Sequence, residues 1–460
     1  MKKIFLLTIA FAVASCNILD QASPNDVDAN NVFISKEGAN SALIGLYNTL
    51  QSRDYYGGYF PMTADLHSDV GIGGGFDNIS LNEISDLAVT PSNNIIENIW
   101  LAIYNSIATA NAIIEKVPGI TDPDFSDIEK NHIVGQAKAI RALCHFDLLR
   151  LFGEHWDIGS AFGIPVVLTV QTVNDVVSRN TVAESYAAII TDLNDAFSAI
   201  IPNDRSQSTV NPMAVKALLA RVKLYKGDMT GAKADAQSVI DDATFFLMDG
   251  VSFPGIYSGR LSSESIFELT FDIQNRSSYN AITYSRGDAL RTEVLFLAES
   301  GVNTFFAGRP GDLRAGLIDF NPATNSSDII PDGRTQKYRG EDTRDNPAYI
   351  IRMAELYLII AEAKGYAGGG LAELNMVRAN RGLANLVDGI DVTTQAGFMI
   401  AVLDERKAEL NFEGHRMFDL ARTGNTNAVL GIGDFRSIMP IPFREITATK
   451  GVIIQNPNYN

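Results

Sequence analysis

DERKAELNFEGHRMFDLARTG, residues 404–424, combines a dense set of charges with apolar residues at helical spacing. The apolar residues that can share one side of a helix or helix pair are Leu403, Leu410, Met417, Leu420 and Ala421. Glu405 and Glu409 are four residues apart and can share a helix face, and His415 and Asp419 have the same spacing. Acids, a histidine and arginines together could serve catalysis. We interpret them instead as an ion-pair network that fixes a C-terminal helix to the domain, since charges interspersed with apolar residues on a helix are usually structural.

The run from Glu405 to Arg422 resembles the C-terminal signature of the SusD/RagB family of outer-membrane nutrient-binding lipoproteins, E-R-[RK]-x-E-L-x-F-E-G-x-R-x-F-D-L-x-R. The resemblance implies that this run is an element of the fold and has no catalytic role. Further segments that resemble the family are RALCHFDLLRLFG at 141–153, RMAELYLIIAEA at 352–363, LNMVRANRGL at 374–383 and IMPIPFREITATKGVIIQNPNY at 438–459. In the last of these, Asn458 stands where glycine is usual in the family.

Composition limits the possible functions. The chain has 460 residues, of which 46% are hydrophobic, so it can form a large core. A formal net charge of −17 argues against nucleic-acid binding, which needs a basic face. Of the two cysteines, Cys16 and Cys144, only Cys144 lies in the expected mature body, so we expect no intramolecular disulfide there and interpret Cys144 as a buried thiol in a helix.

The N-terminus is typical of a targeting signal. Lys2 and Lys3 precede an apolar run, Ile4–Val13, and the small residues Ala14 and Ser15 come directly before Cys16. AVASC resembles a bacterial lipobox, which implies a signal peptide at 1–15 and attachment of fatty acyl chains such as palmitate to Cys16. Several such chains would hold the protein on a membrane. The alternative is an ordinary secretory signal. Residues 16–31 are too polar to pack and are expected to form a flexible tether.

The body, residues 32–460, is expected to form one mainly α-helical domain. Apolar periodicity predicts helices at 36–51, 96–116, 127–152, 183–201 and 213–227, and Ser35 is a plausible N-cap of the first. Residues 217–241 and 352–381 each resemble a tetratricopeptide helix pair, but the two units are not contiguous as in a regular solenoid. SIFELTF, 265–271, predicts a strand. We therefore expect a SusD-like fold, with tetratricopeptide-like helix pairs as scaffold, long irregular loops and a few short strands.

Two segments predicted to be irregular loops, 52–94 and 272–292, supply the candidate ligand residues. These are Tyr55, Tyr56, Tyr59, His67, Asp69, Phe76 and Asp77 in the first segment and Tyr279, Tyr284 and Arg286 in the second. Aromatic rings can stack on the apolar faces of sugars, while carboxylates bind hydroxyls. The alternative is that the tyrosines pack the loop against the body. Trp156, in another loop, is a weaker binding candidate. A P-loop is excluded because no Lys-Ser or Lys-Thr follows the glycines, and no metal or cofactor is expected.

The resemblance implies a lipid-anchored protein of the outer membrane that faces the cell exterior. It would capture a nutrient, most often a glycan, and deliver it to a SusC-like TonB-dependent transporter without breaking bonds. Alternatives are the capture of a peptide or another non-glycan nutrient, a structural scaffold of helical repeats, and a glycosidase with two carboxylates flanking a cleft. The position of the tyrosines separates these hypotheses: convergence on one exposed face favours binding, whereas burial favours a scaffold.

Overall fold

The computed structural model describes residues 32–73, 78–172, 175–278, 296–298, 300–319, 333–338 and 345–459. Helices make up most of this part of the chain, and three two-stranded antiparallel sheets accompany them. The fold class is therefore mainly α with a few short strands, as the sequence predicts. Among the described helices, each is too short or not apolar enough to cross a bilayer. The predicted signal peptide and tether, residues 1–31, lie outside the described residues.

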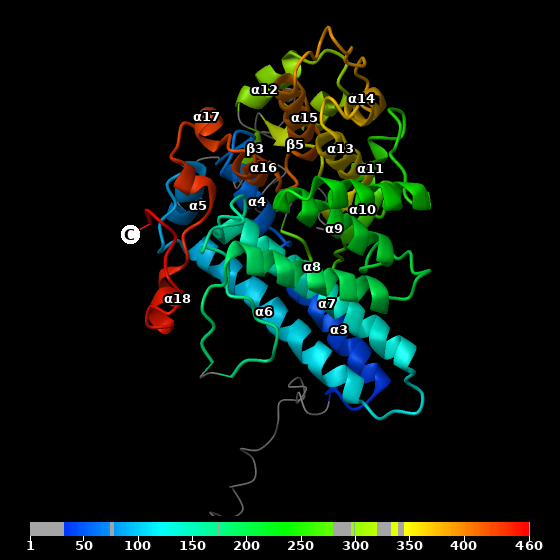
Figure 1. The fold of residues 1–460 in the computed structure, drawn as a ribbon, viewed down its shortest axis with the longest axis vertical. Coiled ribbons are helices and arrows are strands. Elements are labelled where there is room, and N and C mark those ends of the chain that lie inside the picture. The colour runs from blue at the N-terminus through cyan, green and yellow to red at the C-terminus, as the bar shows by residue number, and fades with distance from the viewer. Residues whose placement is uncertain are drawn as a thin grey trace, which may run out of the picture.

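Four long helices of the N-terminal half lie side by side (Figure 1). They are α3 (Lys36–Leu50), α6 (Asn94–Lys116), α7 (Asp127–Phe152) and α8 (Val182–Ala199). Both α6 and α8 pack against α7, and every residue from Ala139 to Phe152 is buried. The predicted cap is confirmed, because Ser35 Oγ accepts a hydrogen bond from Gly38 N at 3.2 Å. Ser126 and Glu129 form a capping box that begins α7.

The repeat-like helix pairs lie next to one another although they are far apart in the sequence. The four helices of these pairs are α9 (Pro212–Lys226), α10 (Met229–Asp242), α13 (Met353–Lys364) and α14 (Leu371–Asn380), and α15 (Gln395–Leu410) packs on α13 beside them. α9 packs on α8, α10 packs on α9 and α13, and α14 packs on α13. The two predicted pairs thus continue a single row of helices that begins with α6 and α7.

The strands form short ladders, and one of them lies in the core. β2 (Ser265–Leu269) pairs antiparallel with β6 (Ala348–Arg352), and both strands are buried along their whole length. The predicted strand at 265–271 is therefore confirmed over its first five residues. β1 (Gly71–Gly73) pairs with β3 (Phe296–Ala298), and β4 (Ile318–Asp319) pairs with β5 (Arg334–Thr335).

Short helices occupy the connections, and one of the loop predictions is wrong. These helices are α4 (Tyr59–Leu66), α5 (Ile79–Ser85), η1 (Val117–Gly119), α11 (Gly255–Ser258), α12 (Ser300–Ala307), η3 (Leu313–Leu317), α16 (Arg416–Arg422), α17 (Thr426–Leu430), η4 (Asp434–Ser437) and α18 (Phe443–Ala448). The segment 52–94 is not an irregular loop, because it contains α4 and α5. All eight residues of α4 are buried, so its aromatic and apolar composition reflects core packing. The C-terminal tail, residues 438–459, contains α18.

Residues 404–424 form a helix pair, α15 and α16, with a sharp break between them. The break lies at Asn411–His415, where Phe412 has a φ of 60° and Gly414 a φ of 79°. A Cβ atom at Gly414 would lie 2.6 Å from the Cα atom of Pro61, so only glycine fits this close approach to α4.

The predicted ion-pair network is present, and it is buried. Glu409 on α15 accepts hydrogen bonds from Arg352 Nη1 at 2.9 Å and Arg381 Nη2 at 2.9 Å, and Arg314 Nη1 donates a third at 3.0 Å. These four side chains are at most 1% exposed. Burial alone would raise the pKa of Glu409, but the three guanidinium charges hold it well below its ordinary value, so the carboxylate stays ionised.

This network connects elements from distant parts of the chain. Arg352 ends β6 and also binds Glu264, which precedes β2, at 2.7 Å. Arg381 follows α14 and binds the same Glu264 at 2.9 Å. Arg314 lies on η3 and contacts Glu405 of α15 at 2.6 Å. The network therefore holds α15 to β2, β6, α14 and η3 at once.

We expect Glu409→Gln to destabilise the fold severely. The substitution keeps the shape of the side chain but leaves three buried guanidinium groups without their shared counter-charge, which costs about 3–5 kcal/mol. The measurement is urea unfolding followed by circular dichroism. Glu373→Gln is the matched control, because the Glu373–Lys364 pair is partly exposed, at 18% and 30%, and should contribute less than about 1 kcal/mol. Equal losses in the two variants would contradict the structural role of the network.

Candidate functional site

Tyr55 and Tyr56 are buried in the core, and neither side chain presents a face to solvent. Their side chains are 0% and 5% exposed. Both hydroxyls donate to Oδ2 of Asp147 on α7, at 2.6 Å and 2.7 Å. Burial, together with the nearby Asp147 charge, raises the pKa of both tyrosines well above the ordinary value, so both remain protonated donors. The alternative reading, that these tyrosines are packing residues, is the one that the structure supports.

The next two candidates, Tyr59 and His67, also have internal partners. Tyr59 is 8% exposed, and its hydroxyl accepts a hydrogen bond from Arg53 Nη2 at 2.8 Å. His67 is 1% exposed, and its two ring nitrogens face the carbonyl oxygens of Ile84 and Arg436 at 3.2 Å and 2.9 Å. These contacts hold the segment around α4 against its neighbours, and a ligand would have to displace them.

Asp69 forms ion pairs between segments that are distant in the sequence. It contacts Lys407 Nζ at 2.7 Å and Arg416 Nε at 2.6 Å. Burial opposes ionisation of Asp69, but the hydrogen bonds and charges of Arg416 and Lys407 hold its pKa below the ordinary value. Asp69 therefore links β1 to α15 and α16 and does not present a free carboxylate.

The remaining candidates, Phe76, Asp77, Tyr279, Tyr284 and Arg286, lie outside the described residues, and their role stays a prediction. The described residues that flank them are neighbours. Gly73 is paired with Phe296 across β1 and β3. Ser278 N donates to Gly57 O at 2.9 Å.

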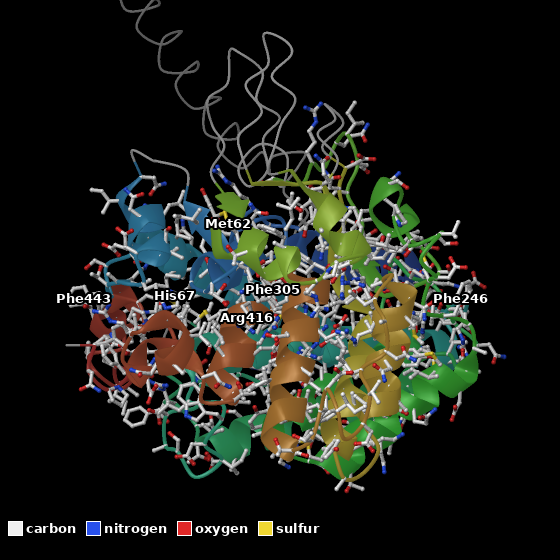
Figure 2. The ribbon with its side chains drawn as sticks, turned by 90° about the horizontal axis from the view of Figure 1, so that it is seen from above. Met62, His67, Phe246, Phe305, Arg416 and Phe443 are labelled. Carbon is white, nitrogen blue, oxygen red and sulfur yellow. The ribbon has the colours of Figure 1, made fainter. Side chains whose placement is uncertain are left out.

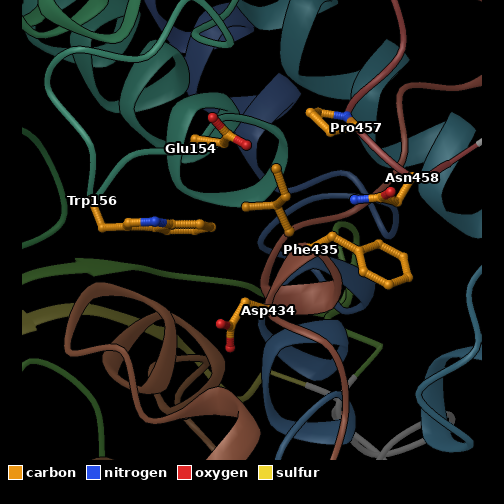
Figure 3. A pocket seen from close by; sticks show the side chains of 7 residues that line it. Glu154, Trp156, Asp434, Phe435, Pro457 and Asn458 are labelled. Atoms are coloured by element: carbon orange, nitrogen blue, oxygen red, sulfur yellow. The ribbon is translucent and has the colours of Figure 1, made fainter.

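An open pocket lies between the end of α7 and the C-terminal tail (Figure 3). Its volume is about 270 Å³, and it is lined by Glu154, Trp156, Asp434, Phe435, Ile438, Pro457 and Asn458. Two aromatic rings, an aliphatic side chain and a proline form its apolar walls. Two carboxylates and one amide supply the polar groups. A mostly apolar wall with a few placed polar groups is typical of small-molecule sites.

The pocket walls are fixed by contacts within the fold. The rings of Phe435 and Tyr459 meet edge to face at 5.3 Å between centroids. Tyr459 Oη donates to Ile438 O at 2.9 Å, and Asn456 Nδ2 donates to Phe152 O at 2.9 Å. The tail, η4 and the end of α7 are therefore tied together, so the pocket exists before any ligand arrives.

Trp156 is held from below by a buried histidine. The His155 ring is 0% exposed and meets the indole edge to face at 5.1 Å. Tyr186 Oη donates to His155 O at 2.9 Å, which fixes the backbone at this point. Burial and the charges of Arg150 and Arg422 lower the pKa of His155 to about 3, so the ring stays neutral. The half-buried indole therefore faces the pocket from a rigid base.

Sequence reasoning identified only Trp156 among the lining residues. Glu154 lies two residues before Trp156 in the chain. Its Oε2 accepts a hydrogen bond from Ser160 Oγ at 2.5 Å. Asn458 has a φ of 65°, a left-handed conformation that explains why glycine is usual there and why asparagine is tolerated. That departure from the family pattern was the one signal in the sequence that pointed to the tail.

No group of three potential metal-ligating side chains occurs within the described ranges. The acids of 405–419 are occupied by arginines and offer no free catalytic pair. Glu405 contacts Arg309 at 2.5 Å, and Asp419 contacts Arg406 at 2.7 Å. The glycosidase hypothesis therefore finds no support in that stretch.

Comparison with known proteins finds similarity to SusD-like proteins. A family model described as starch-binding and associating with the outer membrane matches residues 18–224, and the SusD family model matches residues 326–437. SusD-like protein P2 of Formosa agariphila is 23% identical, over 99% of both chains.

Solved structures agree in fold. A SusD superfamily protein from Bacteroides thetaiotaomicron superimposes with a TM-score of 0.79 at 25% identity, covering 92% of this chain and 100% of that one. A laminarin-binding SusD-like protein gives a TM-score of 0.77 at 23% identity, covering 93% of this chain and 100% of that chain.

We expect Tyr55→Phe to lower stability and to leave ligand binding unchanged. Loss of the hydroxyl removes one of two hydrogen bonds to a buried Asp147 oxygen, at a cost of about 1–3 kcal/mol. Thermal unfolding measures the loss. Tyr366→Phe is the control, because the Tyr366 hydroxyl binds Asp388 near the surface and its removal should cost less. A weakened ligand affinity with unchanged stability would show that Tyr55 reaches the ligand.

Proposed function

Because the chain belongs to the SusD/RagB family, we propose that it is a cell-surface lipoprotein that captures a glycan and delivers it to a SusC-like TonB-dependent transporter. The structural observation that carries the proposal is the preformed pocket in which Trp156 and Phe435 stand beside two carboxylates and an amide (Figure 3). Flat indole and phenyl faces match the apolar faces of sugar rings, and the polar groups match hydroxyls. The fold similarity to a laminarin-binding protein supports the same class of ligand.

The geometry of the pocket is compatible with capture followed by release. The pocket walls are held by hydrogen bonds and ring packing within the fold, so binding should cost little ordering of the protein. It is also small and open, so one site makes few contacts, and the affinity should permit transfer to a transporter. The candidates Phe76, Asp77, Tyr279, Tyr284 and Arg286 are retained in this proposal as possible further contacts with the ligand.

Binding without bond cleavage is favoured over glycoside hydrolysis. A general acid needs an environment that keeps it protonated, such as burial in an apolar site. In the pocket, Asp434 is exposed and Glu154 is only partly buried, with its Oε2 accepting a hydrogen bond from Ser160. The two carboxylates are therefore better suited to accepting hydrogen bonds from a bound sugar.

The proposed location is the outer membrane, with the protein held by acyl chains on Cys16 and facing the cell exterior. The lipobox-like sequence and the family model described as associating with the outer membrane support this location. Peptide or another non-glycan nutrient is the alternative ligand in the same role. A purely structural scaffold is the third hypothesis; the burial of Tyr55 and Tyr56 favours it, and the exposed polar groups of the pocket oppose it.

We expect the full-length protein in detergent to bind one class of glycan in a calorimetric panel of oligosaccharides and oligopeptides, and Trp156→Ala to weaken that binding at least tenfold. Tenfold corresponds to about 1.4 kcal/mol, a modest effect for the loss of a tryptophan contact. The unfolding midpoint should change little, since the indole is half-buried.

The control is Phe246→Ala, which removes another exposed aromatic ring. Phe246 is 56% exposed and lies at the opposite edge of the molecule from Phe443 of α18 (Figure 2). It should bind glycan like the unmodified protein. Binding of peptides alone would replace the glycan proposal with the alternative ligand, and cleavage products would overturn the non-enzymatic mechanism.

We expect Cys16→Ser to release the protein from the membrane. Serine has no thiol to accept the acyl chains, and at roughly 0.8 kcal/mol per buried methylene these chains would supply the anchoring energy. Membrane fractionation and incorporation of labelled palmitate measure the effect. Cys144→Ser is the control, because that thiol is buried and free and should carry no lipid. Unchanged labelling in Cys16→Ser would contradict the proposed anchor.

A further inference from the structure

We propose that the pocket between Trp156 and Asn458 binds a non-anionic sugar unit, neutral or amine-bearing, at the end of a glycan chain, and that it discriminates against uronates and other acidic sugars. This inference rests on the proposed function and specifies the class of ligand for the pocket. It is carried by three features of the pocket, namely its charge, its size and the placement of its amide.

The charged groups that line the pocket are both acidic. Glu154 and Asp434 are carboxylates, and in Figure 3 they lie on either side of the Trp156 indole, which is seen edge-on. No described lysine or arginine forms an ion pair with either of them. A sugar carboxylate in this pocket would therefore meet negative charge in a partly dehydrated space, where repulsion is stronger than in bulk water.

Two arginines, Arg179 and Arg436, interact with lining residues of the pocket, but neither of them lines it. The charge of the Arg179 guanidinium interacts with that of Glu154. The same guanidinium donates to Gly163 O at 2.8 Å and to Ile454 O at 3.0 Å. The Arg436 guanidinium lies over the ring of the lining residue Phe435, 5.5 Å from the ring centroid, and donates to Leu87 O at 2.7 Å. Both guanidinium groups are thus held by backbone carbonyls, and neither lines the pocket. Recognition of an acidic sugar would need such a cation to face the ligand.

The size of the pocket fits a single ring. Its volume of about 270 Å³ lies just below the roughly 300–1,000 Å³ of pockets for drug-sized ligands. A sugar ring could lie against the Trp156 and Phe435 side chains while the rest of the chain extends into solvent through the open side. The pocket is therefore suited to one terminal unit.

The Asn458 amide adds both a donor and an acceptor to the rim. Neutral sugars present hydroxyls that donate and accept, so an amide can satisfy two of them, while the carboxylates can only accept. No described residue is recorded as a partner of the Asn458 side chain, which leaves it available for a ligand. The backbone at this position favours glycine, so Asn458→Gly removes the amide without adding backbone strain.

The test compares matched glycans on the full-length protein in detergent. β-Glucan, mannan and galactan hexasaccharides are each measured by calorimetry beside their own forms oxidised at C6 to uronates. We expect at least one neutral member to bind at least tenfold more tightly than its oxidised form. Because exposed charges are screened by salt, the ratio should shrink between 50 mM and 1 M sodium chloride, where the Debye length is about 3 Å. A ratio independent of salt would indicate exclusion by shape and would overturn the electrostatic inference.

Three variants assign the discrimination to this pocket. The double variant Glu154→Gln with Asp434→Asn should reduce the ratio at least threefold by strengthening the binding of the oxidised form. Asn458→Gly should weaken the neutral form about three- to tenfold with an unchanged unfolding midpoint. Phe246→Ala is the control and should alter neither value.

The outcomes distinguish this inference from the function on which it rests. Oxidised forms that bind as tightly as neutral ones would overturn the inference and leave glycan capture intact. If neutral glycans bind and none of the pocket variants changes their affinity, the binding site lies elsewhere. That result would also overturn the inference and leave glycan capture intact. Failure of every neutral and oxidised hexasaccharide to bind would overturn both the inference and the proposed capture of glycans.

Discussion

The buried carboxylate of Glu409 is the constraint on which the C-terminal half of the fold depends. A charge without water must be neutralised by partners whose positions are fixed, and three arginines from β6, η3 and the end of α14 provide this neutralisation. Each arginine has a second carboxylate partner in Glu264 or Glu405. The helix pair α15–α16 can therefore occupy only one position relative to the sheet β2–β6. Hydrophobic packing alone would tolerate sliding at this interface, because it has no direction.

The fixed position of α15 and α16 also determines where the candidate site lies. α16 follows the break at Gly414, whose lack of a side chain lets the chain pass against Pro61. From α16 the chain continues through η4 to the tail, and Met439 N donates to Leu151 O of α7 at 2.7 Å. The pocket thus lies between the end of α7 and the C-terminal tail, and the tail follows the helix pair that the Glu409 network holds in place. Its rigidity comes from the scaffold, and the ligand does not have to organise it.

The sequence predicted the features that local pattern determines, which are the long helices, the Ser35 cap and the charged network. Apolar spacing located α3, α6, α7 and the helix pairs, and Glu405 and Glu409 were correctly interpreted as structural. The tyrosines were assigned to the wrong environment because their burial depends on Asp147, which lies 92 residues from Tyr55 in the chain. The pocket could not be predicted for a related reason, since it unites residues 154–156 with 434–458 and neither segment alone has a distinctive composition. Trp156 was noticed, but its partners were separated from it by most of the chain.

The left-handed backbone at Asn458 lets the side chain at this position change without affecting the fold. At most positions a change of side chain must satisfy both the backbone and the packing around it. Here the rim residue is exposed, and the conformation accepts glycine at no cost and asparagine at little. Exchange between these two residues adds or removes an amide at the mouth of the pocket while the charged core is untouched. A single substitution at this position can therefore change the polar groups at the mouth of the pocket without a cost to folding.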